Sequence, residues 1–248
     1  MDAFALDLDG VVWLADDPIP GAAAAVARLR AAGAPVAFVT NNSSVPVAEV
    51  AAKLARHGID PGDDVVTSAQ AAAALVAPGE RALVCGGPGV VEALEARGAE
   101  VVRDGDADVV VVGFHRDFDY ERLRVAATAV RRGARLLATN DDATYPTPDG
   151  PIPGGGAIVA AVATGSGVAP IVAGKPHEPM AALVRQRLGV PGVMVGDRLD
   201  TDGRFAGALG YRFALVLSGV TRADDLPVTP EPDLVAPDLS AVVDRLLG

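Results

Sequence analysis

Short apolar runs alternate along the chain with longer stretches in which apolar residues recur at helical spacing. The first run, residues 3–8, is almost wholly apolar and stops at Asp9-Gly10. A helical stretch follows between Pro20 and Gly33, which matches the preference of helices for proline near their start and glycine after their end. This alternation continues to the C-terminus, is typical of βα units and predicts an α/β fold with a mostly parallel, Rossmann-like sheet.

The same alternation predicts the remaining elements. We expect strands over residues 35–39, 65–67, 82–85, 99–103, 108–113, 135–139, 192–196 and 211–217. We expect helices over residues 46–57, 68–77, 88–97, 119–132, 157–165 and 179–188, one ending near 208 and one from 238 onward.

Two interruptions divide this pattern into three segments. Pro78-Gly79 breaks the first series of alternations, and the chain resumes after Gly165-Ser166-Gly167. We therefore expect a core formed by residues 1–78 and 171–248, with an α/β insert of residues 79–170 between them. Both parts fall within the usual size range of domains.

Composition and charge narrow the class of protein. The chain has 248 residues, is 50% hydrophobic and is 21% charged, which is typical of a folded globular protein. No stretch approaches the roughly 18 apolar residues of a spanning helix, and the N-terminus lacks the basic region of a signal peptide, so we expect a cytoplasmic protein with no membrane partner. A net charge of −11 argues against a nucleic-acid partner. Cys85 is the only cysteine, which excludes an intrachain disulfide and a multi-cysteine zinc site.

Aspartate is in excess, with 24 Asp against 8 Glu, so pairs of the form Asp-x-Asp arise by chance. The pair Asp7 and Asp9 differs from the others because it ends an apolar strand and precedes Gly10. Ligands of open α/β sheets gather at the carboxyl ends of the strands. A spacing of two places both side chains on one side of an extended chain, and glycine allows the chain to turn away. By themselves the residues fit a functional pair and a plain strand-end turn equally well.

A second group of aspartates, Asp197, Asp200 and Asp202, follows the apolar strand that ends at Gly196. A single aspartate there would be explained as a helix cap. Three within six residues repel one another unless a divalent cation neutralises them, and a shell of oxygen ligands suits Mg²⁺. This segment therefore predicts a magnesium site.

Two further candidates complete the set. Thr40-Asn41 ends the second strand, where a hydroxyl and free backbone N–H groups could hold an oxyanion, although a cap or turn is equally consistent. Lys175 is one of only two lysines and lies in a Gly-Lys-Pro turn. It fits an ordinary exposed lysine or an ammonium that balances nearby carboxylates. Because all four candidates lie at or near the C-terminal ends of predicted core strands, we expect one sheet to bring them together. Their chemistry suits phosphoryl transfer.

The motif order resembles that of the haloacid dehalogenase superfamily of phosphatases. The motifs are Asp-x-Asp-Gly at 7–10, Thr-Asn-Asn at 40–42, Gly-Lys-Pro at 174–176 and Gly-Asp-Arg-Leu-Asp-Thr-Asp at 196–202. More narrowly, the chain resembles the NagD or p-nitrophenyl-phosphatase branch (subfamily IIA). This resemblance implies that the insert is a substrate-capping domain of the C2 type.

The resemblance also implies roles for the acids. Asp7 would attack phosphorus and form an aspartyl-phosphate. Asp9 would protonate the leaving oxygen and then activate water. Mg²⁺ would be held by Asp7, the backbone carbonyl of Asp9, and Asp197.

The remaining core residues receive supporting roles from the same resemblance. Asp202 would support the water shell of the metal or Lys175. Thr40 and Asn41 would bind the phosphoryl oxygens, and Lys175 would offset their charge. Asp200 has no assigned role.

Within the insert, the loop Asp142–Pro146 occupies the place where this branch sets substrate choice. The candidate specificity residues of this loop are Ala143, Thr144 and Tyr145. The ring of Tyr145 could stack on or cover a leaving group, and a surface aromatic of a loop is an equally good interpretation. Relatives often carry Asp where His115 stands; a histidine there could favour a more anionic substrate, but a solvent-facing side chain is the simpler interpretation. For Cys85 we expect packing rather than reactivity.

These expectations combine into one hypothesis. The chain is expected to be a Mg²⁺-dependent phosphomonoester hydrolase whose partner is a small phosphate ester: a sugar phosphate, a glycerol or glycolate phosphate, pyridoxal phosphate or a nucleoside monophosphate. The alternative is a catalytically silent protein of the same fold that binds phosphate or regulates. The resemblance also allows a homodimer formed through the cap.

Overall fold

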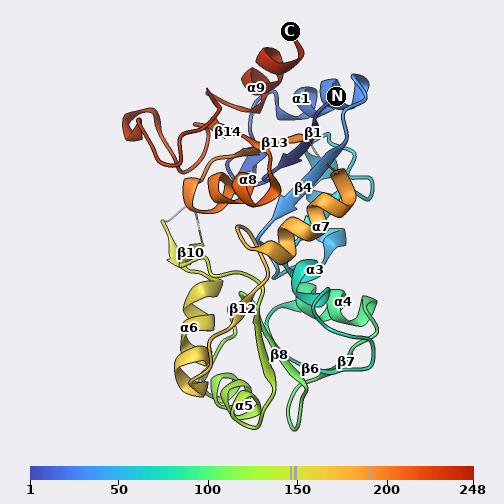
Figure 1. Cartoon of the computed structure of the whole chain (residues 1–248), viewed down its shortest axis with the longest axis vertical. Coiled ribbons are helices and arrows are strands. Elements are labelled where there is room, and N and C mark those ends of the chain that lie inside the picture. Colours follow the sequence, from blue (N-terminus) through green and yellow to red (C-terminus); the bar gives the residue numbers. More distant parts are fainter. Residues whose placement is uncertain (146, 148–149, 190) are drawn as a thin grey trace. The chain divides into compact units, whose positions relative to one another are not determined.

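The computed structural model describes residues 1–145, 147, 150–189 and 191–248. The described residues form two compact units (Figure 1). The first unit comprises Met1–Thr40, Val50–Val66 and Lys175–Gly248, and the second comprises Asn41–Glu49 and Thr67–Gly174. Contact units and domains need not coincide, so the assignment of residues 1–78 and 171–248 to a core and of 79–170 to a cap stays a prediction.

A six-stranded sheet of described residues forms the basis of the first unit, in the order β15-β14-β13-β1-β4-β5. Its strands are β1 (Ala3–Leu6), β4 (Val36–Thr40), β5 (Val65–Thr67), β13 (Gly192–Gly196), β14 (Arg212–Val216) and β15 (Leu234–Ala236). β1 pairs in parallel with β13 and with β4, and β14 and β15 continue the parallel arrangement beyond β13. The three central strands, β13, β1 and β4, are buried along their whole length, as expected for a parallel sheet covered by helices.

The strand order reverses at the centre of this sheet. Counted along the chain, the strands stand in the Rossmann order, with the first and fourth strands, β1 and β13, side by side. Open α/β sheets bind ligands outside the carboxyl ends of the strands at this point of reversal. Asp7 directly follows β1 and Asp197 directly follows β13, so the topology brings both carboxylates to the expected ligand position.

The helices that alternate along the chain with the strands of this sheet are α1 (Ala22–Ala31), α2 (Val47–Arg56), α7 (Glu178–Leu188), α8 (Arg204–Leu209) and α9 (Leu239–Leu247). α1 contacts α9 and β4, whereas α7 contacts β1, β4 and α8. On α2, Val50 and Leu54 are buried at a spacing of four, and Lys53 and Arg56 lie in its last turn. Burial of this apolar face fixes the orientation of α2 and with it the position of Lys53.

The second unit has its own parallel sheet, in the order β12-β9-β8-β6-β7. Its strands are β6 (Arg81–Cys85), β7 (Glu100–Val102), β8 (Val109–Val112), β9 (Arg135–Ala138) and β12 (Ile171–Val172), and its helices are α3 (Ser68–Ala73), α4 (Pro88–Ala96), α5 (Tyr120–Arg131) and α6 (Gly155–Ser166). α5 and α6 pack on each other, and their apolar residues form a core with those of β6, β8 and β9. The predicted α/β fold with an inserted α/β unit is confirmed.

The main elements lie within two residues of their predicted bounds, with one exception. The helix predicted over residues 68–77 ends at Ala73, because Leu75 and Val76 instead donate to carbonyls three residues back, the bonding of a tighter turn. Six short strands of the described residues were not predicted from the sequence. These are β2 (Trp13–Leu14) with β3 (Asp17–Pro18), β10 (Thr144–Tyr145) with β11 (Ile152–Pro153), β12 and β15. Among the described residues, no helix is long and apolar enough to cross a membrane.

Candidate active site

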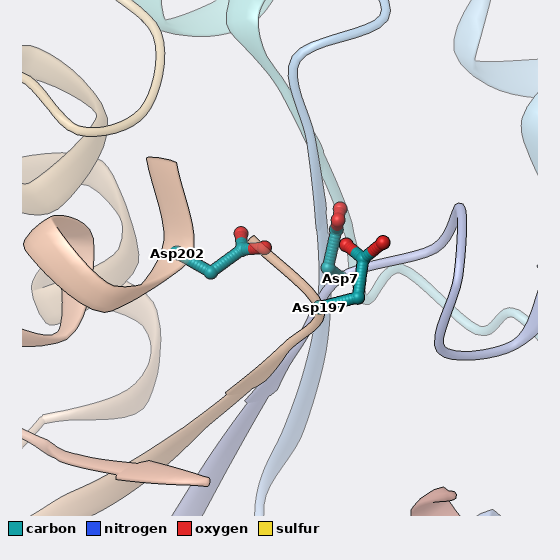
Figure 2. A group of neighbouring side chains, drawn as sticks. All are labelled: Asp7, Asp197 and Asp202. Carbon is teal, nitrogen blue, oxygen red and sulfur yellow. The ribbon is translucent and has the colours of Figure 1, made fainter. Parts of the chain in front are cut away.

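Three carboxylates meet at the carboxyl edge of the first sheet. One ligand oxygen each of Asp7, Asp197 and Asp202 lies within 4.8 Å of the other two. Figure 2 shows Asp7 and Asp197 extending from neighbouring strand ends, with Asp202 pointing toward them from the π-helical turn η1 (Leu199–Gly203). The register pairs Leu6 with Val195, which places the residues after β1 and β13 next to each other. The sheet thus joins residues that are far apart in sequence.

Lys175 lies among these carboxylates. Its Nζ is 2.7 Å from Oδ1 of Asp7 and 2.7 Å from Oδ1 of Asp202, and the lysine is 2% exposed. Burial alone would lower the pKa of Lys175, but the charges of Asp202 and Asp7 raise it above its usual value. Lys175 is therefore a buried cation. The prediction that it follows a core strand is wrong: the preceding strand, β12, pairs with β9 of the second sheet.

Burial also changes the acids. Loss of solvent raises the pKa of Asp197 to about 8 and that of Asp202 to about 6, and repulsion from neighbouring carboxylates adds to both shifts. Burial likewise raises the pKa of Asp7. In this described cluster three carboxylates face one ammonium, so full ionisation leaves two uncompensated negative charges. Such a cluster favours a divalent cation.

The surroundings of Asp197 test whether a metal ion fits. Its Oδ2 accepts a hydrogen bond of 2.6 Å from the backbone N–H of Val220. Its Oδ1 is buried and has no hydrogen-bond partner in the described part of the chain. A buried oxygen without a partner is uncommon in folded proteins. Since all three side chains offer oxygen, the preferred donor of Mg²⁺, the residues fit a magnesium ion.

Glycines make room for these carboxylates. A Cβ on Gly219 would lie 2.0 Å from Oδ2 of Asp197, and one on Gly10 would lie 2.4 Å from the same oxygen. A Cβ on Gly196 would lie 2.2 Å from Cβ of Asp202. The sequence analysis did not assign a role to Gly219. Gly219 lies in the stretch Leu217–Thr221 after β14, and hydrogen bonds join this stretch to Gly10 and to Asp197.

The three aspartates after β13 have different environments. Asp202 accepts a 3.2 Å hydrogen bond at Oδ2 from the backbone N–H of Arg198, in addition to its contact with Lys175. Asp200 is exposed and binds the guanidinium of Arg198 through both oxygens, at 3.1 and 2.8 Å. These hydrogen bonds lower the pKa of Asp200. Asp200 therefore lies outside the cluster, which explains why spacing alone could not assign it.

Asp9 lies in a turn that begins at Leu8. Its Oδ1 accepts a hydrogen bond of 3.0 Å from the indole Nε1 of Trp13. Burial raises the pKa of Asp9 above its usual value. Ser218 donates to the carbonyl of Gly10 at 2.6 Å, which ties this turn to the segment after β14. The sequence analysis missed Trp13, although a single tryptophan four residues after Asp9 was a visible signal.

The boundary between the two units falls between Thr40 and Asn41. Thr40 is buried at the end of β4, the strand next to β1. Asn41 belongs to the second unit. Its side-chain amide donates to Asp142 at 3.0 Å, and its carbonyl accepts from the hydroxyl of Ser68 at 2.7 Å. The roles of Thr40 and Asn41 toward a phosphoryl group stay predictions.

In the second unit, Thr144 and Tyr145 form β10, and Ala143 precedes them as an exposed residue. The ring of Tyr145 stacks on that of Phe114, with centroids 5.1 Å apart and planes 9° apart. The sequence pattern gave no signal for this contact of Phe114. Pro146, the last residue of the predicted specificity loop, lies outside the described residues.

His115 and Cys85 are both buried. The interpretation of His115 as solvent-facing is wrong: it is 7% exposed, Nδ1 lies 2.9 Å from the carbonyl of Gly113, and the ring meets Phe118 edge-on. Apolar packing outweighs the polarity of the imidazole here.

Cys85 is buried as predicted, and burial raises the pKa of its thiol to about 11. The thiol therefore stays protonated and unreactive.

Sequence profiles of known families match both ends of the chain. The profile described as haloacid dehalogenase-like hydrolase matches residues 4–100, and a second profile described as HAD hydrolase-like matches residues 172–242. The matched ranges contain Asp7, Asp9, Lys175 and Asp197.

Whole-chain comparisons agree with the profiles. The chain is 40% identical over 232 residues to D-glycerol 3-phosphate phosphatase of Mycobacterium tuberculosis, covering 90% of this chain and 65% of that protein's length. It is 36% identical over 254 residues to an acid sugar phosphatase of Staphylococcus saprophyticus, covering 98% of this chain and 97% of the relative. Among solved structures, glycerol phosphate phosphatase from M. tuberculosis in complex with magnesium matches with a TM-score of 0.89 at 38% identity, over 97% of this chain and 76% of the other.

Proposed function

This chain belongs to the haloacid dehalogenase-like hydrolases, and we propose that it is a magnesium-dependent phosphomonoester hydrolase that acts on a small phosphorylated metabolite. One observation carries the proposal: the buried cluster of Asp7, Asp197 and Asp202 around Lys175, with Asp9 two residues from the first acid. A purely structural ion pair would not need two carboxylates in excess, because buried charge without compensation destabilises a fold.

Asp7 is the nucleophile in this proposal. An oxygen of its carboxylate forms a bond to phosphorus while the bond from phosphorus to the ester oxygen breaks. Lys175 supports this step because its ammonium, 2.7 Å from Oδ1, orients the carboxylate and opposes the rise in pKa that burial causes. Thr40 and Asn41 bind phosphoryl oxygens, as the family resemblance implies.

Asp9 moves the protons. In the first step it gives a proton to the leaving ester oxygen, which departs as an alcohol. In the second step it accepts a proton from a water molecule that attacks phosphorus, which releases inorganic phosphate and restores Asp7. The same carboxyl group thus acts first as an acid and then as a base.

Magnesium would be held by Asp7, Asp197 and the backbone carbonyl of Asp9, with Asp202 supporting its water shell or Lys175. When bound, it supplies positive charge that offsets the phosphoryl oxygens. The buried Oδ1 of Asp197, which has no hydrogen-bond partner among the described residues, supports the part of Asp197 in this ligand set.

Relatives guide the choice of substrate. Their names refer to glycerol 3-phosphate and to acid sugars, so glycerol phosphate and sugar phosphates are the first esters to test, before glycolate phosphate, pyridoxal phosphate and nucleoside monophosphates. We propose that Ala143, Thr144 and Tyr145 influence this choice. The stacking of Tyr145 on Phe114 supports this proposal because it gives the Tyr145 ring a defined apolar contact. His115 is left out because its ring is buried.

A cytoplasmic location and a homodimer formed through the cap predicted over residues 79–170 complete the proposal. The proposed substrates, small phosphorylated metabolites, support the cytoplasmic location, and the family resemblance implies the dimer. Sedimentation velocity at several protein concentrations tests the oligomeric state.

The test of the function is turnover of 4-nitrophenyl phosphate and of a panel of phosphate esters, with magnesium and with a chelator. We expect hydrolysis that requires the metal and a clear ranking of kcat/KM among the esters. Binding of inorganic phosphate without hydrolysis of any ester would instead support the catalytically silent alternative.

A further inference from the structure

Asp9 receives a hydrogen bond that the reaction scheme above does not use. Nε1 of Trp13 donates to Oδ1 of Asp9 at 3.0 Å, within the normal range for N–H···O bonds. An indole N–H can only donate. Whatever the protonation state of Asp9, Oδ1 must therefore serve as an acceptor for as long as this bond exists.

Trp13 is held firmly in place. It is 4% exposed, and it opens the hairpin of β2 and β3, in which it lies opposite Pro18. Two backbone hydrogen bonds join Trp13 to the turn that carries Asp9. The N–H of Gly10 donates to the carbonyl of Trp13 at 2.7 Å, and the N–H of Trp13 donates to the carbonyl of Leu8 at 3.2 Å. The indole and the carboxylate therefore keep one relative geometry.

Lys53, on α2, contacts the hairpin of β2 and β3 at several points. Nζ of Lys53 lies 4.4 Å from the centre of the Trp13 ring, a cation–π contact. The same ammonium donates to the carbonyl of Ala15 at 2.5 Å and lies 3.6 Å from a carboxylate oxygen of Asp16. The ring of His57 is a further neighbour of the indole, at 5.8 Å between centroids. Lys53 on α2 and His57, the residue directly after this helix, thus fix the ring that binds Asp9.

We infer that Trp13 is a positioning residue that determines which oxygen of Asp9 carries the transferred proton. A protonated carboxyl has one O–H group and one oxygen that only accepts. Because the carbonyl oxygen of a carboxyl is a stronger acceptor than its hydroxyl oxygen, an indole N–H at Oδ1 favours the acid form that carries its proton on Oδ2. This inference rests on the proposed function, in which Asp9 is the proton donor.

The proton balance follows directly. As the bond between Asp7 and phosphorus forms and the ester bond breaks, the proton leaves Oδ2 for the departing oxygen, and Asp9 becomes a carboxylate that still accepts from Trp13 at Oδ1. The same Oδ2 then takes a proton from the attacking water. Without the indole N–H, the carboxyl can place its proton on either oxygen and can rotate, so fewer molecules hold it toward the leaving group.

This role has a signature that a structural role lacks. Proton donation matters more for a poor leaving group than for a good one, because a stable anion departs without help. The constant kcat/KM reports the steps through loss of the leaving group. We therefore compare phenyl phosphate, whose phenol is the poorer leaving group, with the closely similar 4-nitrophenyl phosphate.

The experiment measures kcat/KM for both esters with the magnesium-loaded wild type, Trp13→Phe and Tyr211→Phe. We expect Trp13→Phe to lower the value for phenyl phosphate at least about tenfold more than that for 4-nitrophenyl phosphate, within the range of general acid catalysis. Tyr211→Phe is the matched control, because it also removes a largely buried aromatic hydrogen-bond donor, one that bonds the carbonyl of Gly189 at the other end of the strands. It should leave the ratio of the two constants unchanged.

A second variant covers the case in which Trp13→Phe does not fold. The chain has a single tryptophan, so biosynthetic replacement by the benzothiophene analogue exchanges only this N–H for sulfur and keeps the shape of the ring. Equal losses for the two esters in the folded variant would overturn the inference and leave the proposed function standing. Failure of the wild type to hydrolyse either ester would overturn the proposed function itself.

Discussion

The ammonium of Lys175 lies 2.7 Å from Oδ1 of Asp7, and both groups are almost completely withdrawn from solvent. A buried ion pair of this kind is costly to break, because the remaining partner stays buried without compensation, at about 3–5 kcal/mol. Lys175→Met should therefore lower the free energy of unfolding by this order at neutral pH and suppress turnover. Chemical denaturation measures the first effect. The control is Lys53→Met, at the only other lysine. Lys53 is partly exposed and contacts the hairpin of β2 and β3, so its replacement should lower the free energy of unfolding much less. Equal losses in the two variants would contradict the assignment of a buried ion pair.

Asp197 and Asp200 offer a matched pair for the metal site. Asp197→Asn removes a charged oxygen donor from the cluster, so we expect the magnesium concentration that half-saturates activity to rise at least about tenfold. Asp200→Asn changes the same charge three residues away, at a carboxylate that pairs with Arg198 outside the cluster. Its metal requirement should stay near that of the wild type. A similar shift in both variants would show a general charge effect instead of a ligand.

The raised pKa values predict how the metal-free protein responds to pH. A carboxyl with a pKa near 3.8 when unfolded and about 8 when folded keeps its proton better in the folded state. Between these values the folded state binds more protons than the unfolded state, so stability falls as the pH rises. Asp202 and Asp7 act in the same direction. Unfolding in the presence of a chelator should thus become easier toward pH 8, and Asp197→Asn should reduce the slope. A stability that rises across this window would contradict the assignment.

Gly219 and Gly207 separate a packing effect at the site from a general effect of glycine replacement. Gly219→Ala would place a methyl group 2.0 Å from Oδ2 of Asp197 and should displace this carboxylate, which lowers turnover and weakens magnesium binding. At Gly207, in α8, no described atom lies within 4 Å of the added methyl group. Gly207→Ala should keep activity and hold or slightly raise the melting temperature. Normal activity of Gly219→Ala would remove the argument from close approach.

The long elements and two acids of the site followed from the sequence because each rests on a strong local signal. Buried strands such as β1 and β13 read as apolar runs, and parallel pairing brings the residues after them, Asp7 and Asp197, to one edge. The choice of Asp202 over Asp200 came from the family resemblance. In the fold it depends on the π-helical turn η1, which points one carboxylate inward and leaves the other with Arg198.

Other features depend on tertiary contacts that leave no pattern along the chain. Two-residue strands such as β2 have no periodicity, so the hairpin that brings Trp13 to Asp9 was not predicted. The pairing of β12 with β9 assigns the strand before Lys175 to the other sheet. For His115, polarity alone favours exposure, and only the packed ring of Phe118 and the nearby carbonyl of Gly113 explain its burial.

The central claim is that the carboxylate of Asp7 attacks phosphorus, and the turnover of 4-nitrophenyl phosphate by Asp7→Asn tests it most directly. An amide of nearly the same shape keeps the packing but lacks a nucleophilic oxygen, so we expect a loss of about 10⁴-fold or more in kcat, with a circular dichroism spectrum like that of the wild type. A folded Asp7→Asn protein that retains kcat within about tenfold of the wild type would contradict the account.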